Sequence, residues 1–269
     1  MREWIQGLGG AGVDTVLGAG HALGILWLSL RRMVNPRHAG REFRAVVIQM
    51  HDHGVKAIPV VALVAVFTGM IVSLQAGVEI KGFGQEHLVG RIVAASMFRE
   101  MGPLITAIIL TATAGSACAA EIGTMRVSEE VDALEMMAID PVRFLVVPRV
   151  AALGLMCFAL TILTDCFGTL GGAVVARSQL GVSYEVYFEG ARRTLESEHV
   201  LGFLSKHVYS GLVKAFVFGV LIGVVGCAQG LRATGGALGV GRAVRRAVVA
   251  SIVLVLVLGY YMTWFFYGR

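Results

Sequence analysis

The sequence has few charged residues. Asp, Glu, Lys and Arg make up 15% of its 269 residues, against roughly 25% in an ordinary soluble domain. Hydrophobic residues make up 56%, and there are 35 glycines. So little charge excludes an ordinary soluble globular domain, and glycine is tolerated in membrane helices, where small residues let helices approach closely. The composition therefore predicts an all-α polytopic membrane protein.

The sequence also lacks the motifs of several function classes. It has no G-x-x-x-x-G-K-[ST] phosphate loop, so the chain is not expected to hydrolyse a nucleotide. It has no H-E-x-x-H motif and no recognisable Ser/His/Asp set, so we predict that it is not an enzyme. The N-terminus shows no signal peptide with a cleavage site.

Metal and disulfide chemistry are equally poorly supported. The four cysteines lie in apolar segments at no metal-ligand spacing, which is typical of small buried side chains: Cys118, Cys157, Cys166 and Cys227. The triplet His51-Asp52-His53 stands alone beside an expected membrane surface. We therefore predict neither a disulfide framework nor a metal site.

Five apolar segments are long enough to span a membrane, which takes about 20 residues. They cover 57–78, 88–120, 148–176, 209–228 and 247–267. The second is too long for one straight crossing, and we expect Gly102-Pro103 to break or kink it. Residues 8–34 are apolar but dilute, which predicts an interfacial amphipathic helix, with a sixth span as the alternative. No linker is apparent, so residues 1–269 are expected to form one domain.

Lys and Arg are unevenly distributed between the loops. With the N-terminus in the cytoplasm and the C-terminus outside, the cytoplasmic loops carry almost twice as many Lys and Arg residues as the opposite face. The positive-inside rule favours this orientation. Because membrane topology accounts for the net charge of +5, the basic character does not indicate nucleic-acid binding.

The loop between the second and third segments predicts a short acidic helix over residues 128–140. Ser128 is the expected N-cap, and Asp140-Pro141 the expected end. Acidic residues fill the first turn, where the helix dipole favours them: Glu129, Glu130 and Asp132. Apolar residues recur at helical spacing: Val131, Leu134, Met137 and Ala138. Such a helix either packs against the bundle or docks into a partner protein.

Four charged residues stand inside the apolar segments and away from the membrane-surface loops, in which Arg91 and Arg149 are counted. Arg99 and Glu100 are adjacent in the second, Asp165 lies in the third and Lys214 in the fourth. One charge at the centre of a membrane helix costs at least ~2.5–3.5 kcal/mol, so these residues are either structural partners or a substrate contact. Asp165 and Lys214 could pair with one another or with Arg99.

Small residues in the third and fourth segments are expected to serve helix packing. They are Gly168, Gly171, Gly172, Gly219 and Gly223.

Two long stretches resemble a known family. They are "FREMGPLITAIILTATAGSACAAEIGTMRVSEEVDALEMMAIDPVRFLVVPRVAA", residues 98–152, and "GVGRAVRRAVVASIVLVLVLGYYMTWFF", residues 239–266. They closely resemble the MlaE/YrbE permeases, membrane subunits of ABC transporters that move lipids together with MCE-domain proteins. The likeness runs from about residue 40 to the end. Thr113 replaces a common Arg and Gly259 a frequent Asp, which leaves the head-group chemistry open.

The resemblance implies an N-terminal interfacial helix, five transmembrane helices and a short cytoplasmic coupling helix that contacts the ATPase. It maps ATPase coupling onto Ser128, Glu129, Glu130, Asp132, Leu134, Glu135, Met137 and Asp140. It places Arg99 and Glu100 at a lipid-binding cavity, and Gln75 is added as a candidate substrate contact. Asp165 and Lys214 are kept as interior polar residues.

The implied function is a permease subunit that moves phospholipids between the inner membrane and an MCE-domain partner. ATP and Mg would bind to a separate ATPase subunit and no cofactor to this chain. The implied assembly is a homodimer with the ATPase, a hexameric MCE-domain protein and a STAS-domain accessory protein, located in the cell inner membrane.

Two other function classes stay open. An ion-gradient-driven secondary transporter of a hydrophobic substrate would use Asp165 and Glu100 as proton carriers. A scaffolding subunit without a substrate path would tolerate loss of both Arg99 and Glu100.

Overall fold

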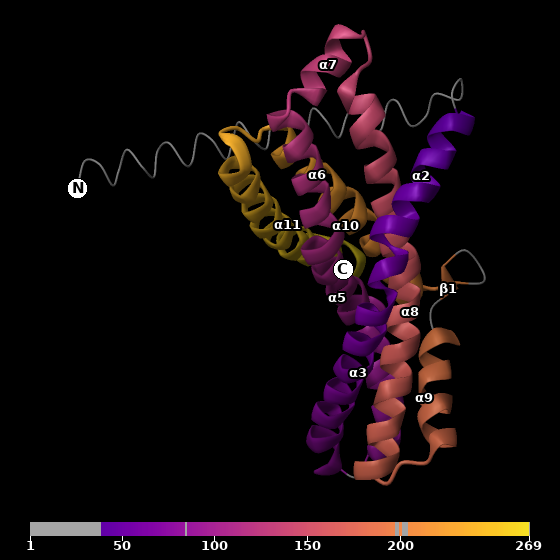
Figure 1. Ribbon diagram of the computed structural model, residues 1–269. Helices are drawn as coiled ribbons and strands as arrows, with labels where there is room; N and C mark the ends of the chain where they lie inside the picture. Colours follow the sequence, from indigo (N-terminus) through magenta and orange to yellow (C-terminus); the bar gives the residue numbers. More distant parts are fainter. Residues whose placement is uncertain (1–38, 84, 197–198, 201–203, 269) are drawn as a thin grey trace. The chain divides into compact units, whose positions relative to one another are not determined.

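The computed structural model describes residues 39–83, 85–196, 199–200 and 204–268 (Figure 1). The predicted interfacial helix at 8–34 lies outside the described residues and stays a prediction. Among the described residues, strand structure is confined to one antiparallel pair, β1 (His199–Val200) with β2 (Leu204–Ser205). Almost everything else that is described is helical, as the composition predicts.

Five helical runs are long and apolar enough to cross a membrane. They are Arg44–Ile80, Val89–Val127, Val142–Gln179, Lys206–Leu231 and Gly236–Tyr267. The prediction of five spans in an all-α protein is therefore confirmed. Each run is longer than the predicted apolar segment, because a helix continues into polar turns that hydropathy does not mark.

The runs are made of the following elements. The first holds α2 (Ala39–His53), the 3₁₀ turn η2 (Val55–Ala57) and α3 (Ile58–Lys81). The second holds α4 (Val89–Ser96), η4 (Met97–Met101), α5 (Gly102–Leu110), η5 (Thr111–Gly115) and α6 (Ser116–Val127). The third holds η6 (Val142–Val146) and α8 (Val147–Gln179). The last two are α10 (Lys206–Leu231) and α11 (Gly236–Tyr267). The connections hold η3 (Glu86–Leu88), α7 (Glu130–Met136) and α9 (Tyr184–Glu196).

The second run does not break at Pro103. A π-helical turn, η4, ends just before the proline, and the N–H of Gly102 donates to the carbonyl of Met97, five residues back. Such π turns insert one extra residue and often mark functional positions. The run thus continues past Gly102-Pro103 through a local widening, a π turn that is itself a recognised cause of the kink that was the other expectation. η5 is a second such turn in the same run.

The chain divides into two compact units. Unit 1 contains the described residues of 39–51, 111–153 and 220–253, and unit 2 those of 52–110, 154–219 and 254–268. The helices α8, α10 and α11 each contribute residues to both units. The single domain over residues 1–269 stays a prediction. The two units are described separately below.

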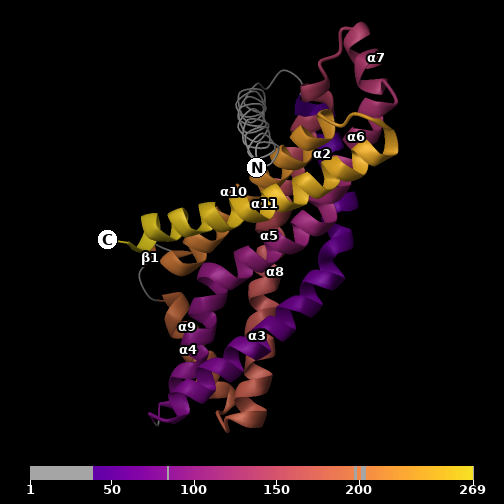
Figure 2. The same ribbon diagram turned by 90° about the vertical axis from the view of Figure 1, so that its left-hand side faces the viewer.

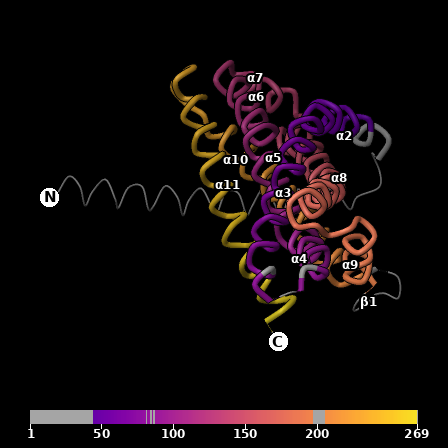
Figure 3. The backbone as a smooth tube through the Cα atoms, turned by 90° about the horizontal axis from the view of Figure 1, so that it is seen from below, coloured from indigo at the N-terminus to yellow at the C-terminus, as the bar shows by residue number. Residues whose placement is uncertain are grey.

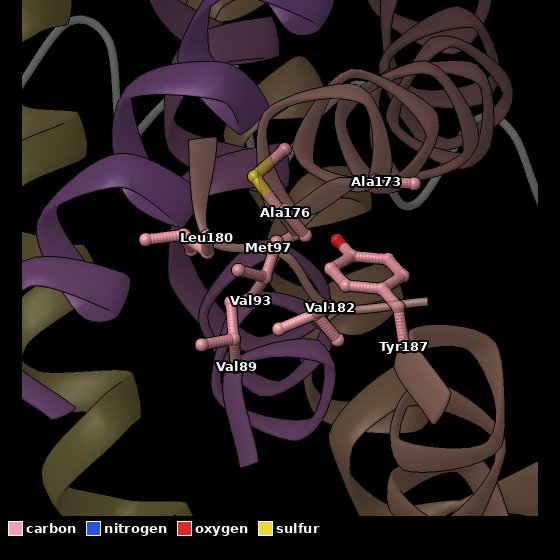
Figure 4. Packing of buried hydrophobic residues seen from close by; sticks show 8 residues of the cluster. All are labelled: Val89, Val93, Met97, Ala173, Ala176, Leu180, Val182 and Tyr187. Atoms are coloured by element: carbon pink, nitrogen blue, oxygen red, sulfur yellow. The ribbon is translucent and has the colours of Figure 1, made fainter. Parts of the chain in front are cut away.

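The core of unit 2 forms where α9 packs along α4 (Figures 2 and 3). Figure 4 shows its buried residues, which come from α4, η4, the end of α8, the connection after it, and α9: Val89, Val93, Met97, Ala173, Ala176, Leu180, Val182 and Tyr187. The hydroxyl of Tyr187 donates to the carbonyl of Thr169 at 3.1 Å. Burial raises the pKa of this hydroxyl, which keeps it a donor.

Glycines set the close approach of α3 and α8 in unit 2. A Cβ added to Gly171 would overlap the carbonyl of Val66, and one added to Gly69 would overlap that of Gly168. Gly172 leaves room for the Tyr187 hydroxyl. The packing role predicted for Gly168, Gly171 and Gly172 is therefore confirmed.

Unit 1 uses the same device between α6 and α10. A Cβ on Gly226 would lie 2.9 Å from the carbonyl of Gly115, and one on Gly230 would lie 2.9 Å from that of Ala119. Gly223 packs on Val150 in the same unit, as predicted. Gly219, which belongs to unit 2, is buried. α7 lies beyond α6 at one end of unit 1 (Figures 1 and 2).

Candidate functional site

Arg99 and Glu100 lie in η4, four and three residues before Pro103. Proline has no N–H, so the carbonyl of Arg99 lacks the donor that an α-helix would supply from residue 103. Lys214 of α10 takes that place, because its Nζ donates to the carbonyl oxygen of Arg99 at 3.1 Å. α10 can approach because a Cβ on Gly211 would overlap the carbonyl of Phe98.

The Lys214 ammonium has one acceptor for each of its three N–H groups. Besides the Arg99 carbonyl, Nζ lies 2.6 Å from Glu100 Oε1 and 2.9 Å from Thr263 Oγ1. The Lys214 side chain is 1% exposed and that of Glu100 is 37% exposed. A fully hydrogen-bonded ammonium beside a carboxylate can be buried at a tolerable cost, so the arrangement explains how a lysine lies inside a span.

Thr263 of α11 closes this polar cluster. Its hydroxyl lies 2.9 Å from Glu100 Oε1 and 2.8 Å from the carbonyl of Gly259, and it can donate to one of them while it accepts from Lys214. The cluster therefore joins η4, α10 and α11 within unit 2. Of the two expected partners of Lys214, Asp165 forms no ion pair with it among the described residues, and Arg99 contacts it only through the backbone carbonyl. Its ionic partner is Glu100.

The Arg99 side chain has no carboxylate partner in the part of the chain that the structure describes. Its guanidinium carbon lies 3.7 Å from the centre of the Tyr267 ring, a cation–π contact. The Tyr267 hydroxyl lies 2.8 Å from Ser210 Oγ, which fixes the ring. Because Lys214 neutralises Glu100, Arg99 leaves the cluster with a net positive charge and hydrogen-bond donors that are still free for an anion.

Asp165 lies apart from this network. It is 2% exposed, and its Oδ1 has no hydrogen-bond partner among the described residues. The carboxyl group fills the space beside Gly102, where an added Cβ would overlap Oδ1. A buried carboxylate oxygen without a partner is costly, so Asp165 occupies an unfavourable position within α8.

The other sequence-derived residues of this region do not join the cluster. Gln75 is exposed on α3 and makes no hydrogen bond to Arg99 or Glu100 among the described residues. Thr113 is exposed on η5. Sequence reasoning missed Thr263 and Tyr267, although both carry hydroxyl groups and follow Gly259 at roughly one-turn intervals near the end of α11.

The acidic helix α7 is shorter than predicted and starts differently. Ser128 is the C-cap of α6 and not the N-cap of α7. Glu129 occupies the N-cap position in a left-handed conformation, with φ of 61°. The Ser128 prediction was wrong because α6 continues into the loop and ends on the residue that was expected to start the next helix.

α7 ends at Met136, before the predicted end at Asp140. The N–H of Ala138 donates to the carbonyl of Glu135 and that of Ile139 to the carbonyl of Leu134, each at 2.9 Å. With Ala138 at φ of 59°, these two bonds form a Schellman motif. Asp140 instead starts the following helix, since its Oδ1 accepts from the N–H of Val142 at 3.0 Å.

The surface of α7 is acidic and apolar at once. Val131 is buried and Leu134 half-buried, whereas Met136 is 83% and Met137 62% exposed. Asp132 pairs with Arg126 of α6. The remaining carboxylates are exposed and have no ion-pair partner in the described ranges: Glu129, Glu130 and Glu135. Only part of the predicted apolar face is thus covered by the chain itself.

Comparison with known proteins gives one family. The family described as Permease MlaE matches residues 46–265. The intermembrane phospholipid transport system permease protein MlaE of Haemophilus influenzae is 31% identical over 266 residues, which cover 99% of this chain and 98% of that protein. A probable ABC transporter permease protein of Synechocystis is 36% identical over 82% of this chain and 81% of its own length. The chloroplastic protein TRIGALACTOSYLDIACYLGLYCEROL 1 of Arabidopsis thaliana is 34% identical over 84% of this chain and 62% of its own length.

Proposed function

The chain belongs to the MlaE permease family, and from this premise we propose that it is the membrane subunit of an ABC transporter that moves phospholipids. The observation that carries the proposal is the similarity over almost the whole chain to the permease of a phospholipid transport system. The polar cluster and α7 supply a chemical basis for the two activities that such a subunit needs, which are substrate contact and coupling to an ATPase.

The polar cluster is the proposed head-group contact. Arg99 is a cation without a carboxylate partner among the described residues, held against Tyr267 at the end of α11. A guanidinium group binds a phosphate through two parallel hydrogen bonds. The phosphate of a phospholipid would bind to the Arg99 guanidinium. Glu100 would not compete for that guanidinium, because its carboxylate pairs with Lys214.

α7 is the proposed contact with the ATPase. Its exposed methionines Met136 and Met137 supply an apolar surface, and Glu129, Glu130 and Glu135 supply charge for a basic groove. ATP and Mg bind to the separate ATPase subunit. When the ATPase closes on ATP, it moves α7. Because α7 follows α6, and α6 belongs to the same helical run as η4, the motion is transmitted along this run to η4.

The wider assembly follows from the same proposal. The chain forms a homodimer in the cell inner membrane, with its N-terminus in the cytoplasm and its C-terminus in the periplasm. An MCE-domain protein receives or delivers the lipid on the periplasmic side, and a STAS-domain protein is an accessory subunit. The distribution of Lys and Arg in the loops supports this orientation.

Purification of the chain from its native membrane in nanodiscs tests the proposal. Mass spectrometry should identify an ATPase, an MCE-domain protein and a retained phospholipid. Arg99→Ala should lose the lipid, whereas Arg177→Ala, which removes an exposed arginine at the end of α8, should keep it. A chain that purifies without an ATPase even after crosslinking would refute the proposal that it is a subunit of an ABC transporter.

Asp165 keeps a second candidate function open, namely an ion-driven transporter. A buried carboxyl group without a partner in the described structure is what a proton carrier requires. In reconstituted vesicles, this alternative expects transport driven by a proton gradient without any ATPase, and its loss in Asp165→Asn. The ABC proposal expects transport only with the ATPase and ATP.

A further inference from the structure

The turn between α10 and α11 in unit 1 encloses a small cavity that the proposed transport function does not use. Its volume is about 90 Å³, roughly the space of three water molecules in the liquid. Polar side chains dominate its lining: Gln229, Arg232, Thr234, Arg242 and Arg246. A cavity of this size accommodates one small polar group.

The lining of this cavity carries positive charge without compensating carboxylates among the described residues. Three of its lining residues are arginines, and in the described part of the chain none of the three has a carboxylate within ion-pair distance. Arg242 and Arg246 are one helical turn apart, a spacing at which like charges destabilise a helix. Arg232 adds a third charge from the turn directly after α10. The lining therefore favours an anion.

The backbone of the turn holds the arginines around the cavity. Gly235 and Gly236 have φ of 87° and 68°, a region that other residues rarely adopt. A Cβ on Gly235 would lie 3.3 Å from Arg242 Nη2, so this guanidinium folds back over the glycine. A Cβ on Gly239 would overlap the carbonyl of Thr234. The turn is thus fixed in a form that keeps Arg242 at the cavity.

An exposed aliphatic stripe continues from the cavity along α11. Arg242, Arg246, Val249 and Val253 follow one another at spacings of three or four residues, which places them on one face of the helix. Val249 is 57% and Val253 is 52% exposed. A phosphate-sized basic cavity followed by an apolar stripe matches the order of head group and acyl chain in a phospholipid.

The side of the membrane on which the turn is expected also favours an anionic phospholipid. The turn and α7 lie at the same end of unit 1 (Figures 1 and 2). Both connections are expected on the cytoplasmic side, where the leaflet contains anionic lipids and basic pockets between membrane helices bind their head groups.

We propose that the cavity lined by Arg232, Arg242 and Arg246 binds the phosphate of an anionic phospholipid of the cytoplasmic leaflet, whose acyl chain lies along Val249 and Val253. This site shares no residue with the polar cluster around Arg99. It is a resident lipid site at the α10–α11 turn and does not depend on whether Arg99 contacts the transported lipid.

Native mass spectrometry of the full chain in detergent tests this site. The probes are a phosphatidylglycerol, a phosphatidylcholine with the same acyl chains, and inorganic phosphate. Each Lys or Arg near an anionic surface contributes about 1 kcal/mol, so Arg242→Gln with Arg246→Gln should weaken phosphatidylglycerol binding about 30-fold. Arg192→Gln with Arg193→Gln on α9 removes the same charge from exposed ion pairs and should change binding less than twofold.

The remaining outcomes are decisive as well. Equal losses in the two double variants would overturn the site, because they would indicate a bulk charge effect. Inorganic phosphate that binds as tightly as phosphatidylglycerol, with no effect of Val249→Ser and Val253→Ser, would overturn the lipid assignment in favour of a free anion. Dissociation of a dimer by the two valine variants would show that a second copy covers the stripe. We expect the arginine double variant to show the same 30-fold loss in a chain that also carries Arg99→Ala. If the proposed transport function is wrong, this loss should stay the same, because the two sites share no residue.

Discussion

The polar cluster around Lys214 and the helix α7 differ in whether their charged side chains have partners within the chain. In the polar cluster of unit 2, the Lys214 ammonium has three acceptors, and Glu100 accepts from Lys214 and lies within hydrogen-bond distance of the Thr263 hydroxyl. On α7, the exposed Glu129, Glu130 and Glu135 have no ion-pair partner in the part of the chain that is described. The first site is preorganised by the chain itself, whereas the second leaves charges that, in the proposed function, the ATPase would pair with. Substitutions should therefore reduce stability at the first site and coupling at the second.

The largest effect is expected for Lys214→Met. The substitution leaves Glu100 and the Arg99 carbonyl without their donor, and removal of one member of a buried ion pair costs about 3–5 kcal/mol. Because Glu100 is 37% exposed, we expect the lower end, a loss of about 3 kcal/mol, in thermal unfolding of the detergent-solubilised protein.

Lys56→Met is the matched control for that experiment. Lys56 forms an exposed pair with Asp52 at 2.9 Å, and such pairs contribute about 0.3–0.5 kcal/mol. Equal losses of stability in the two variants would contradict the assignment of Lys214 as the centre of the cluster.

The next effect is expected for Gly102→Ala. Its Cβ would overlap the Asp165 carboxyl group, and overpacking of this kind costs about 1–3 kcal/mol. Asp165→Ala in the same chain should restore most of the loss, because it removes the overlapping atoms. Gly241→Ala on α11 meets nothing within 4 Å and should be neutral or stabilising. Absence of rescue by Asp165→Ala would show that the two side chains do not share this space.

Sequence alone accounts for the elements of the cluster but not for its pairing. Hydropathy marks all five spans, and the cost of charge in a membrane marks Arg99, Glu100 and Lys214. Which of them pair depends on how closely α10 crosses η4, which brings together side chains 114 positions apart in the chain. The π turn at η4 has no sequence signature beyond the following proline, so neither the direction of Glu100 nor the bond from Lys214 to the Arg99 carbonyl could be predicted.

At α7 the sequence misleads for a different reason. Helix ends are usually marked by glycine in the left-handed position, and here Ala138 takes it without such a mark. The sequence predicts a helix end at Asp140-Pro141, whereas Asp140 caps the helix that follows. The acidic and apolar character of the segment was predicted, because it is a property of composition and spacing and does not depend on the exact ends.

A coupling effect without a stability effect is expected on α7. Glu129→Lys, Glu130→Lys and Glu135→Lys together should lower ATP-driven lipid transport about tenfold, since reversed charges on a docking surface repel a basic groove by several tenths to a few kcal/mol. The unfolding temperature should stay almost unchanged, because these side chains are exposed. Replacement of the same residues by Gln should give an intermediate transport rate. Full transport with the three lysines would exclude α7 as the coupling helix.

The smallest effect is expected for Ala138→Gly, and its sign is the informative part. A non-glycine residue in the left-handed region costs roughly 1–2 kcal/mol, while glycine adds about 0.5–1 kcal/mol of entropy to the unfolded chain, so the net gain should be about 0.5 kcal/mol. Ala133→Gly in the middle of α7 has no strain to relieve and should instead lose about 1 kcal/mol. If Ala138→Gly gains stability but lowers coupling, the left-handed residue stiffens the end of α7 so that it moves as one piece with the partner. If it gains stability and leaves coupling unchanged, the strain belongs to the turn alone, and the exposed face of α7 carries the whole of the coupling.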